Sequence, residues 1–147
     1  MNAQDVDAHT KLYLSKSDYK TPYGETTPAQ IKNVMDRVLT YLEEVTPIGV
    51  IDKNTQNPIS DYKKIDKNSI IAKGTHSITN YTWGVTYSAM LNAAKITGDE
   101  RYKKYVKDRF KFLSEVAPYF MAVLPEANKD ADPQMRQVLR PEALDDA

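Results

Sequence analysis

The chain has 147 residues, of which 41% are hydrophobic and 27% charged, the balance of a globular domain large enough to bury a core. Its 20 basic and 20 acidic side chains cancel, so no overall field attracts nucleic acid or an anionic membrane, and neither is predicted as a partner. No apolar run approaches the roughly 20 residues that span a bilayer, and the absence of cysteine excludes disulfides and thiolate metal sites.

The N-terminal region, residues 1–25, predicts an irregular lead-in because it is polar, with tyrosines spaced through Lys, Ser and Asp. After the initial Met, residues 2–5 (Asn, Ala, Gln, Asp) fit the small-residue end of a removed signal peptide, although so short a run also arises by chance. This pattern predicts a periplasmic or extracellular protein.

The first strong helix signal starts at Thr27, a preferred N-cap residue, followed by Pro28, which is favoured at the first helical position. Apolar residues then recur every three or four positions, as on one face of an amphipathic helix. They are Ile31, Val34, Met35, Val38, Leu39 and Leu42. Pro47 disfavours helix in the residue before it, so the helix is predicted to end at about Thr46.

The next segment changes character. Residues 48–51 are short and β-branched, and turn residues follow, which predicts a small hairpin or extended insertion near 48–60. Residues 62–74 are predicted to continue as a charged loop that contains an apolar Ile70-Ile71 pair.

Two consecutive helices are predicted from Asn80 to Ile96 and from Asp99 to Pro118, because both segments keep helical spacing of their apolar residues. Gly98 between them suits the left-handed position that ends a helix, and Asp99 suits the N-cap of the next. Helices joined by so short a turn lie antiparallel, as an αα-hairpin.

The C-terminal region is predicted to be a long surface loop over residues 119–140, followed by a helix that begins at Pro141. Because that helix has only begun when the printed sequence stops, we expect residues 26–147 to be the N-terminal portion of a larger, truncated domain.

Two segments are candidates for chemistry. Residues 80–87 place one Trp and two Tyr at the start of a helix, either as a sugar-contacting surface or as an aromatic core stripe. Asp145 and Asp146 are either a general acid with its neighbour or exposed carboxylates that favour a helix N-terminus. His9 and His76 have no metal-site spacing, although His76 precedes the Trp-bearing helix and is a candidate substrate contact.

The order of these elements resembles the unsaturated uronyl hydrolases of glycoside hydrolase families 88 and 105, in particular the unsaturated rhamnogalacturonyl hydrolases. The likeness covers roughly residues 28–147. It is carried by the aromatic-Trp-Gly helix start at residues 80–87, the Thr97-Gly98-Asp99 turn, and the Leu-Asp-Asp run at 144–146. The Thr-Gly-Asp turn alone is shared with many α/α toroids.

The resemblance implies an all-α fold in which six helical hairpins close into an (α/α)6 barrel, with this chain forming its N-terminal part. It also implies that the substrate is a 4,5-unsaturated uronic acid at the non-reducing end of an oligosaccharide left by a polysaccharide lyase, such as a pectic one. An Asp protonates the vinyl ether double bond at C4, water adds at C5, and the hemiketal opens and releases the sugar. No cofactor is implied.

Carried onto this sequence, the acid matches Asp145, with Asp146 as the second choice. Thr82 stands where the family commonly has a second carboxylate, so a role that needs a charge there is in doubt. Trp83 and Tyr87 become pocket wall or core, and Arg136 is a candidate for the uronate carboxylate.

Two other readings use the same hairpins. One is a non-catalytic helical-repeat glycan-binding module, which needs no acid at Asp145, and the other is a different α/α-toroid enzyme, such as a sugar epimerase or another glycosidase. If most of a barrel is missing, apolar helix faces are exposed, so we expect the chain alone to be inactive and to self-associate.

Overall fold

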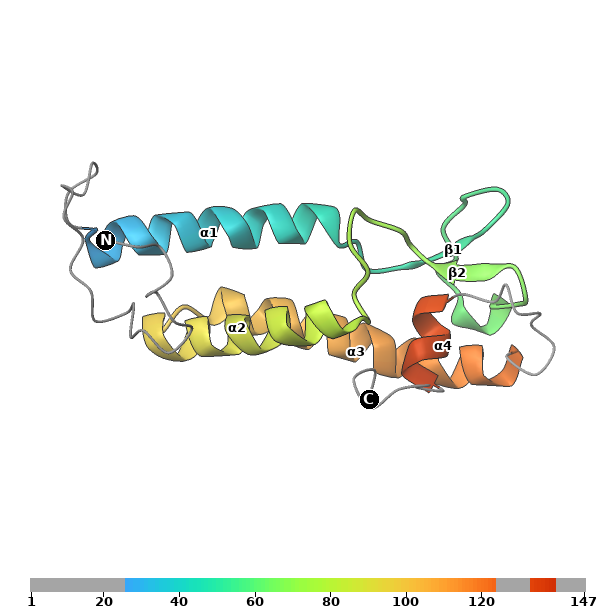
Figure 1. Cartoon of the computed structure of the whole chain (residues 1–147). Helices are drawn as coiled ribbons and strands as arrows, with labels where there is room; N and C mark the ends of the chain where they lie inside the picture. The colour runs from blue at the N-terminus through green and yellow to red at the C-terminus, as the bar shows by residue number, and fades with distance from the viewer. Residues whose placement is uncertain (1–25, 124–132, 140–147) are drawn as a thin grey trace, which may run out of the picture.

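The computed structural model describes residues 26–123 and 133–139, and it confirms the predicted helical fold with a small hairpin inserted (Figure 1). In chain order the elements are α1 (Pro28–Val45), β1 (Val50–Asp52), the 3-10 helix η2 (Tyr62–Lys64), β2 (Ser69–Ile71), α2 (Tyr81–Thr97), α3 (Glu100–Val123) and α4 (Pro133–Leu139). The helices α1, α2 and α3 run alongside one another, and the β-hairpin and α4 lie toward one end (Figure 1). The predicted lead-in at 1–25 and the helix from Pro141 lie outside the described residues.

Helix α1 begins as its sequence predicts. The Thr27 hydroxyl accepts the backbone N–H of Gln30 at 3.3 Å, and the Gln30 side chain accepts the backbone N–H of Thr27 at 2.8 Å. This reciprocal capping box satisfies two backbone donors that a helix start leaves free, while Pro28 has none to satisfy. The helix ends at Val45 with Thr46 as its C-cap.

The predicted hairpin of α2 and α3 is also confirmed. The Asn80 side chain caps α2, and Gly98 ends it in the left-handed conformation at φ 71°. The Asp99 carboxylate accepts the backbone N–H of Arg101 at 3.1 Å, which satisfies a free donor in the first turn of α3. Residues 97–99 therefore reverse the chain within a single turn.

The core lies where α1 covers the α2–α3 hairpin. Tyr102, Tyr105 and Val116 of α3 are at most 1% exposed. Of the six apolar residues predicted along one face of α1, only Leu39 and Leu42 are buried, whereas Ile31, Val34 and Val38 are about half exposed at 50%, 56% and 46%. The α2–α3 hairpin therefore covers only one side of this apolar stripe.

A cluster of ion pairs joins the first half of α1 to the turn between α2 and α3. Lys32 lies 2.9 Å from carboxylate oxygens of both Asp36 and Asp99, and Arg101 bridges the same two carboxylates at 2.8 and 2.6 Å. The Tyr102 hydroxyl donates to Asp36 at 2.8 Å. Hydrogen bonds from Arg101 and Lys32 hold the pKa of Asp99 well below its usual value, and bonds from Lys32 and Tyr102 lower the pKa of Asp36.

The small hairpin is longer than predicted. Strand β1 pairs antiparallel with β2, with Val50 opposite Ile71 and Asp52 opposite Ser69. The partner strand therefore lies inside residues 62–74, which were predicted to be a loop, and its Ile70 and Ile71 are 5% and 0% exposed. Each strand has only three residues, which is too few for an alternation of apolar and polar side chains to be recognised in the sequence.

The C-terminal half of the chain contains more helix than predicted. Helix α3 passes through Pro118 and continues to Val123, because Val116 and Phe120, at 0% and 4% exposure, are held in the core on both sides of the proline. Residues 119–123 and 133–139 of the predicted surface loop are helical, and Met135 of α4 is 1% exposed. Burial of these side chains outweighs the single hydrogen bond that Pro118 cannot make.

Candidate functional site

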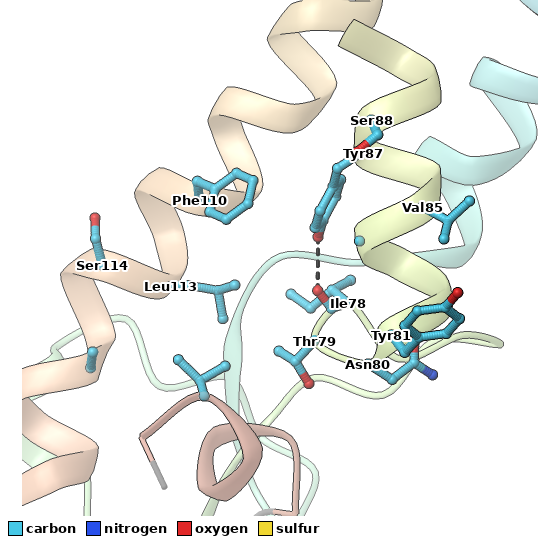
Figure 2. Close-up of a pocket in the computed structure, with 13 residues that line it drawn as sticks. Ile78, Thr79, Asn80, Tyr81, Val85, Tyr87, Ser88, Phe110, Leu113 and Ser114 are labelled. Carbon is cyan, nitrogen blue, oxygen red and sulfur yellow. Dashed lines mark hydrogen bonds between the residues drawn. The ribbon is translucent and has the colours of Figure 1, made fainter. Parts of the chain in front are cut away.

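A groove of about 830 Å³ opens beside the first half of α2 (Figure 2). One wall comes from α2, the opposite wall from the middle of α3, and residues 78–80 with Val138 of α4 close it. The lining residues are Ile78, Thr79, Asn80, Tyr81, Gly84, Val85, Tyr87, Ser88, Phe110, Leu113, Ser114, Ala117 and Val138. Phe110 and Leu113 point from α3 toward Tyr87 on α2 (Figure 2).

The groove offers apolar surface with a few polar groups. Tyr81, Val85 and Phe110 are exposed by 62%, 56% and 55%, so large apolar or aromatic side chains face solvent here. Phe110 therefore lies on the groove surface and not in the core. Apolar walls with a small number of polar groups are typical of a ligand site.

Tyr87 shapes the groove and leaves its own hydroxyl occupied. The hydroxyl donates to the Ile78 carbonyl at 2.8 Å, which fixes the segment before α2 against the helix (Figure 2). Burial raises the pKa of Tyr87 far above its usual value, so the group remains a neutral donor. At 6% exposure Tyr87 belongs to the core and also forms part of the groove wall, so it has both of the roles that the sequence left open.

The start of α2 fixes Thr82 and Asn80. The side-chain oxygen Oδ1 of Asn80 accepts hydrogen bonds from the Trp83 backbone N–H at 3.1 Å and from the Thr82 hydroxyl at 2.7 Å. Thr82 is exposed but does not line the groove, and its hydroxyl already has this partner. Asn80 does line the groove, and its amide nitrogen has no hydrogen-bond partner among the described residues, so this donor can meet a ligand.

Trp83 lies on another side of α2, away from the groove lining, and is 5% exposed. Its indole N–H donates to the Tyr105 hydroxyl at 3.2 Å, and its ring stacks on His76 with centroids 5.2 Å apart. Trp83 is therefore a core residue covered by His76, and the structure brings these two predicted residues together. The stack continues to Tyr41 of α1, whose ring centroid lies 6.4 Å from that of His76.

Arg109 is only 4% exposed, and its contacts hold the residues around Trp83 in place. Its guanidinium donates to the Thr46 carbonyl at 2.9 Å and to the Tyr105 carbonyl at 3.1 Å, and it lies 3.5 Å from the centroid of the Tyr105 ring. Burial lowers the pKa of Arg109. The contacts fix the end of α1 against α3, and through Tyr105 they fix the indole of Trp83.

The remaining predicted site residues do not join this region. Arg136 is half-buried in α4 and does not line the groove, whereas Val138 of the same helix does. Asp145 and Asp146 lie outside the described residues. The sequence missed Tyr41 because its contact with His76 spans 35 positions, and it missed Arg109 as a support, although a charged residue within an apolar helical stripe was a signal.

Residues 26–123 and 133–139 lack two kinds of feature. No group of three or more His, Cys, Asp or Glu side chains is arranged there to hold a metal ion. In the same ranges, no helix combines the length and apolar character needed to cross a membrane.

Comparison with known proteins decides the family. Residues 50–140 match the profile of glycosyl hydrolase family 88. The chain belongs to this family. A search of curated proteins finds no match. The segment that matches family 88 runs from β1 through α4, so it contains the α2–α3 hairpin, the whole groove lining and His76, while Tyr41 and Thr46 of the first helix precede it.

Proposed function

We propose that this family 88 chain belongs to a hydrolase that removes a 4,5-unsaturated uronic acid from the non-reducing end of lyase-generated oligosaccharides. The observation that carries the proposal is the family match over residues 50–140, which includes both walls of the groove. Membership supports a glycosidase that acts on a carbohydrate, and the unsaturated uronate is the substrate that the sequence resemblance implies. Pectic products such as unsaturated rhamnogalacturonan disaccharides are the first substrates to test.

In this proposal Asp145 is the general acid and base. Its proton adds to C4 of the vinyl ether, water attacks C5 and returns a proton to the same carboxylate, and the C5 hemiketal then opens and releases the next sugar. One group performs both transfers, so no second carboxylate at the anomeric carbon is required. This agrees with a hydroxyl at Thr82, which is bonded to Asn80.

The groove beside α2 supports the proposal, because its lining could contact a sugar. Phe110 and Leu113 form apolar wall against which a sugar ring can pack, and the amide nitrogen of Asn80 is a donor for a sugar oxygen. Arg136 remains the proposed partner of the uronate carboxylate. We also propose that the protein acts in the periplasm or outside the cell, where lyases release such oligosaccharides.

The test is an activity assay on the gene product that contains this chain. Hydrolysis removes the conjugated double bond, so the ultraviolet absorbance of an unsaturated disaccharide should fall, while a saturated disaccharide of the same sugars should remain intact. Absence of activity on a panel of unsaturated uronides would refute the proposal.

The two neighbouring carboxylates provide matched variants. Asp145→Asn should lower kcat by about a hundredfold or more, the scale of general acid–base catalysis, and Asp146→Asn should retain most activity. The reverse result would assign the acid role to Asp146. Equal and small effects of both substitutions would place the acid elsewhere.

A further inference from the structure

A second aromatic surface lies at the C-terminal end of α1, apart from the groove lining. Tyr41 of α1, His76 of the segment between β2 and α2, and Trp83 of α2 form a continuous stack. The edge of the Tyr41 ring meets the His76 ring at 74°, and the His76 and Trp83 rings lie within 26° of parallel. Figure 1 shows the segment before α2 passing the end of α1.

The backbone holds this stack in place. The Thr75 N–H donates to the Val45 carbonyl at 3.0 Å, which ties the segment before α2 to the end of α1. A Cβ atom at Gly74 would lie 1.9 Å from the same carbonyl oxygen, so only glycine permits this approach. The indole of Trp83 is bonded to Tyr105, so the ring at the base of the stack is fixed as well.

The outer two rings face solvent. Tyr41 is 48% exposed and His76 is exposed, whereas Trp83 beneath them is 5% exposed. Within the described ranges, neither the Tyr41 hydroxyl nor the His76 ring nitrogens make a hydrogen bond. A fixed aromatic surface with unused polar groups at its edge matches a pyranose ring, which presents C–H groups on its face and hydroxyls around its rim.

We propose that Tyr41 and His76 form a sugar-binding subsite that stacks a pyranose residue of the oligosaccharide. The inference rests on the proposed function and adds to it a contact from α1, which precedes the segment matched to family 88. Tyr41 supplies the ring that the sugar packs against, and His76 supplies a hydrogen-bonding group beside it. Trp83 is the base of the stack and does not itself meet the ligand.

Trp83 makes the subsite observable, because it is the only tryptophan in the 147 residues and it touches His76 directly. Titration of an unsaturated rhamnogalacturonan disaccharide, and of a saturated oligogalacturonide, into the gene product should give a saturable change in tryptophan emission. If the protein contains other tryptophans, they are replaced by phenylalanine. A sugar that binds without any change in Trp83 emission would overturn the proposal.

Three variants test the contact itself. Tyr41→Ala should weaken binding by about tenfold, the loss expected for one aromatic stacking contact, while Tyr41→Phe keeps the ring and should lose less than about threefold. Tyr119→Ala is the matched control, since Tyr119 is 37% exposed and its ring contacts Tyr62 instead. Tyr41 is exposed, so circular dichroism should show the fold intact in its variants.

The outcomes separate this inference from the proposed function. Full cleavage of unsaturated uronides with unchanged sugar affinity and KM in Tyr41→Ala would refute the subsite and leave the hydrolase proposal standing. Failure of the unsubstituted protein both to bind and to cleave any unsaturated uronide would refute both.

Discussion

Substitution of Gly74 by alanine tests how the segment before α2 is held. The added Cβ would lie 1.9 Å from the carbonyl oxygen of Val45 and 2.8 Å from its carbonyl carbon, both of them backbone atoms that cannot rotate away. The segment must therefore move outward from α1. That movement breaks the hydrogen bond from the Thr75 N–H to Val45 and separates His76 from its neighbours in the stack.

The expected loss follows from those contacts. One net backbone hydrogen bond contributes about 1 kcal/mol, and an aromatic pair contributes about 0.5–1.5 kcal/mol beyond its buried area. We therefore expect Gly74→Ala to lower the free energy of unfolding by about 2 kcal/mol. For a chain of this size this corresponds to a Tm lower by about 4–8 °C.

Urea unfolding followed by Trp83 emission measures this directly, and Gly84→Ala is the matched control. Apart from its chain neighbours and the backbone of its own helix, no heavy atom lies within 4 Å of a Cβ at Gly84, and alanine is favoured over glycine within a helix by about 0.8–1.0 kcal/mol. The control should therefore unfold at a higher urea concentration. A Gly74→Ala protein as stable as the unsubstituted one would show that the close approach to Val45 does not hold the segment.

Three further outcomes are expected. Tyr105→Phe removes the acceptor of the Trp83 indole N–H, so it should cost about 1 kcal/mol in urea unfolding and shift the tryptophan emission; an unchanged spectrum would contradict this bond. The pKa of Asp99 is lowered in the folded state, so its stabilisation is complete above the unfolded value of about 3.9 and is lost as pH falls below it. Urea midpoints between about pH 5 and pH 2 should therefore fall less steeply in Asp99→Asn, and equal slopes would refute the ion-pair contribution. The half-exposed Val34 and Val38 should drive self-association of the 147-residue chain, which Val38→Lys should reduce in sedimentation velocity; a monomer before substitution would refute this.

The elements that local sequence encodes were predicted well. Thr27 and Pro28 start α1, and Gly98 with Asp99 reverses the chain, because each acts on backbone groups within a few residues. Pro118 misled the prediction of α3, since a proline's local penalty is visible in sequence while the burial of Phe120 that outweighs it is not. The pairing of β1 with β2 was also missed, because the two short segments are separated along the chain by a 3-10 helix.

The candidate site was predicted in part. Helical spacing placed Trp83 and Tyr87 on α2, but it did not show that they serve different surfaces, with Tyr87 at the groove and Trp83 under His76. That division depends on where α1 and α3 lie around α2. Tyr41 could not be found from sequence because its partner approaches through a backbone contact at Gly74.

The buried guanidinium of Arg109 has a practical consequence for anyone shortening this protein. A version trimmed to the family match would start at residue 50. It would retain Arg109 but lose both Thr46 oxygens that accept hydrogen bonds from its guanidinium. Chain boundaries chosen from the family match alone would therefore remove hydrogen-bond acceptors of Arg109, whereas a start ahead of Thr27 preserves them.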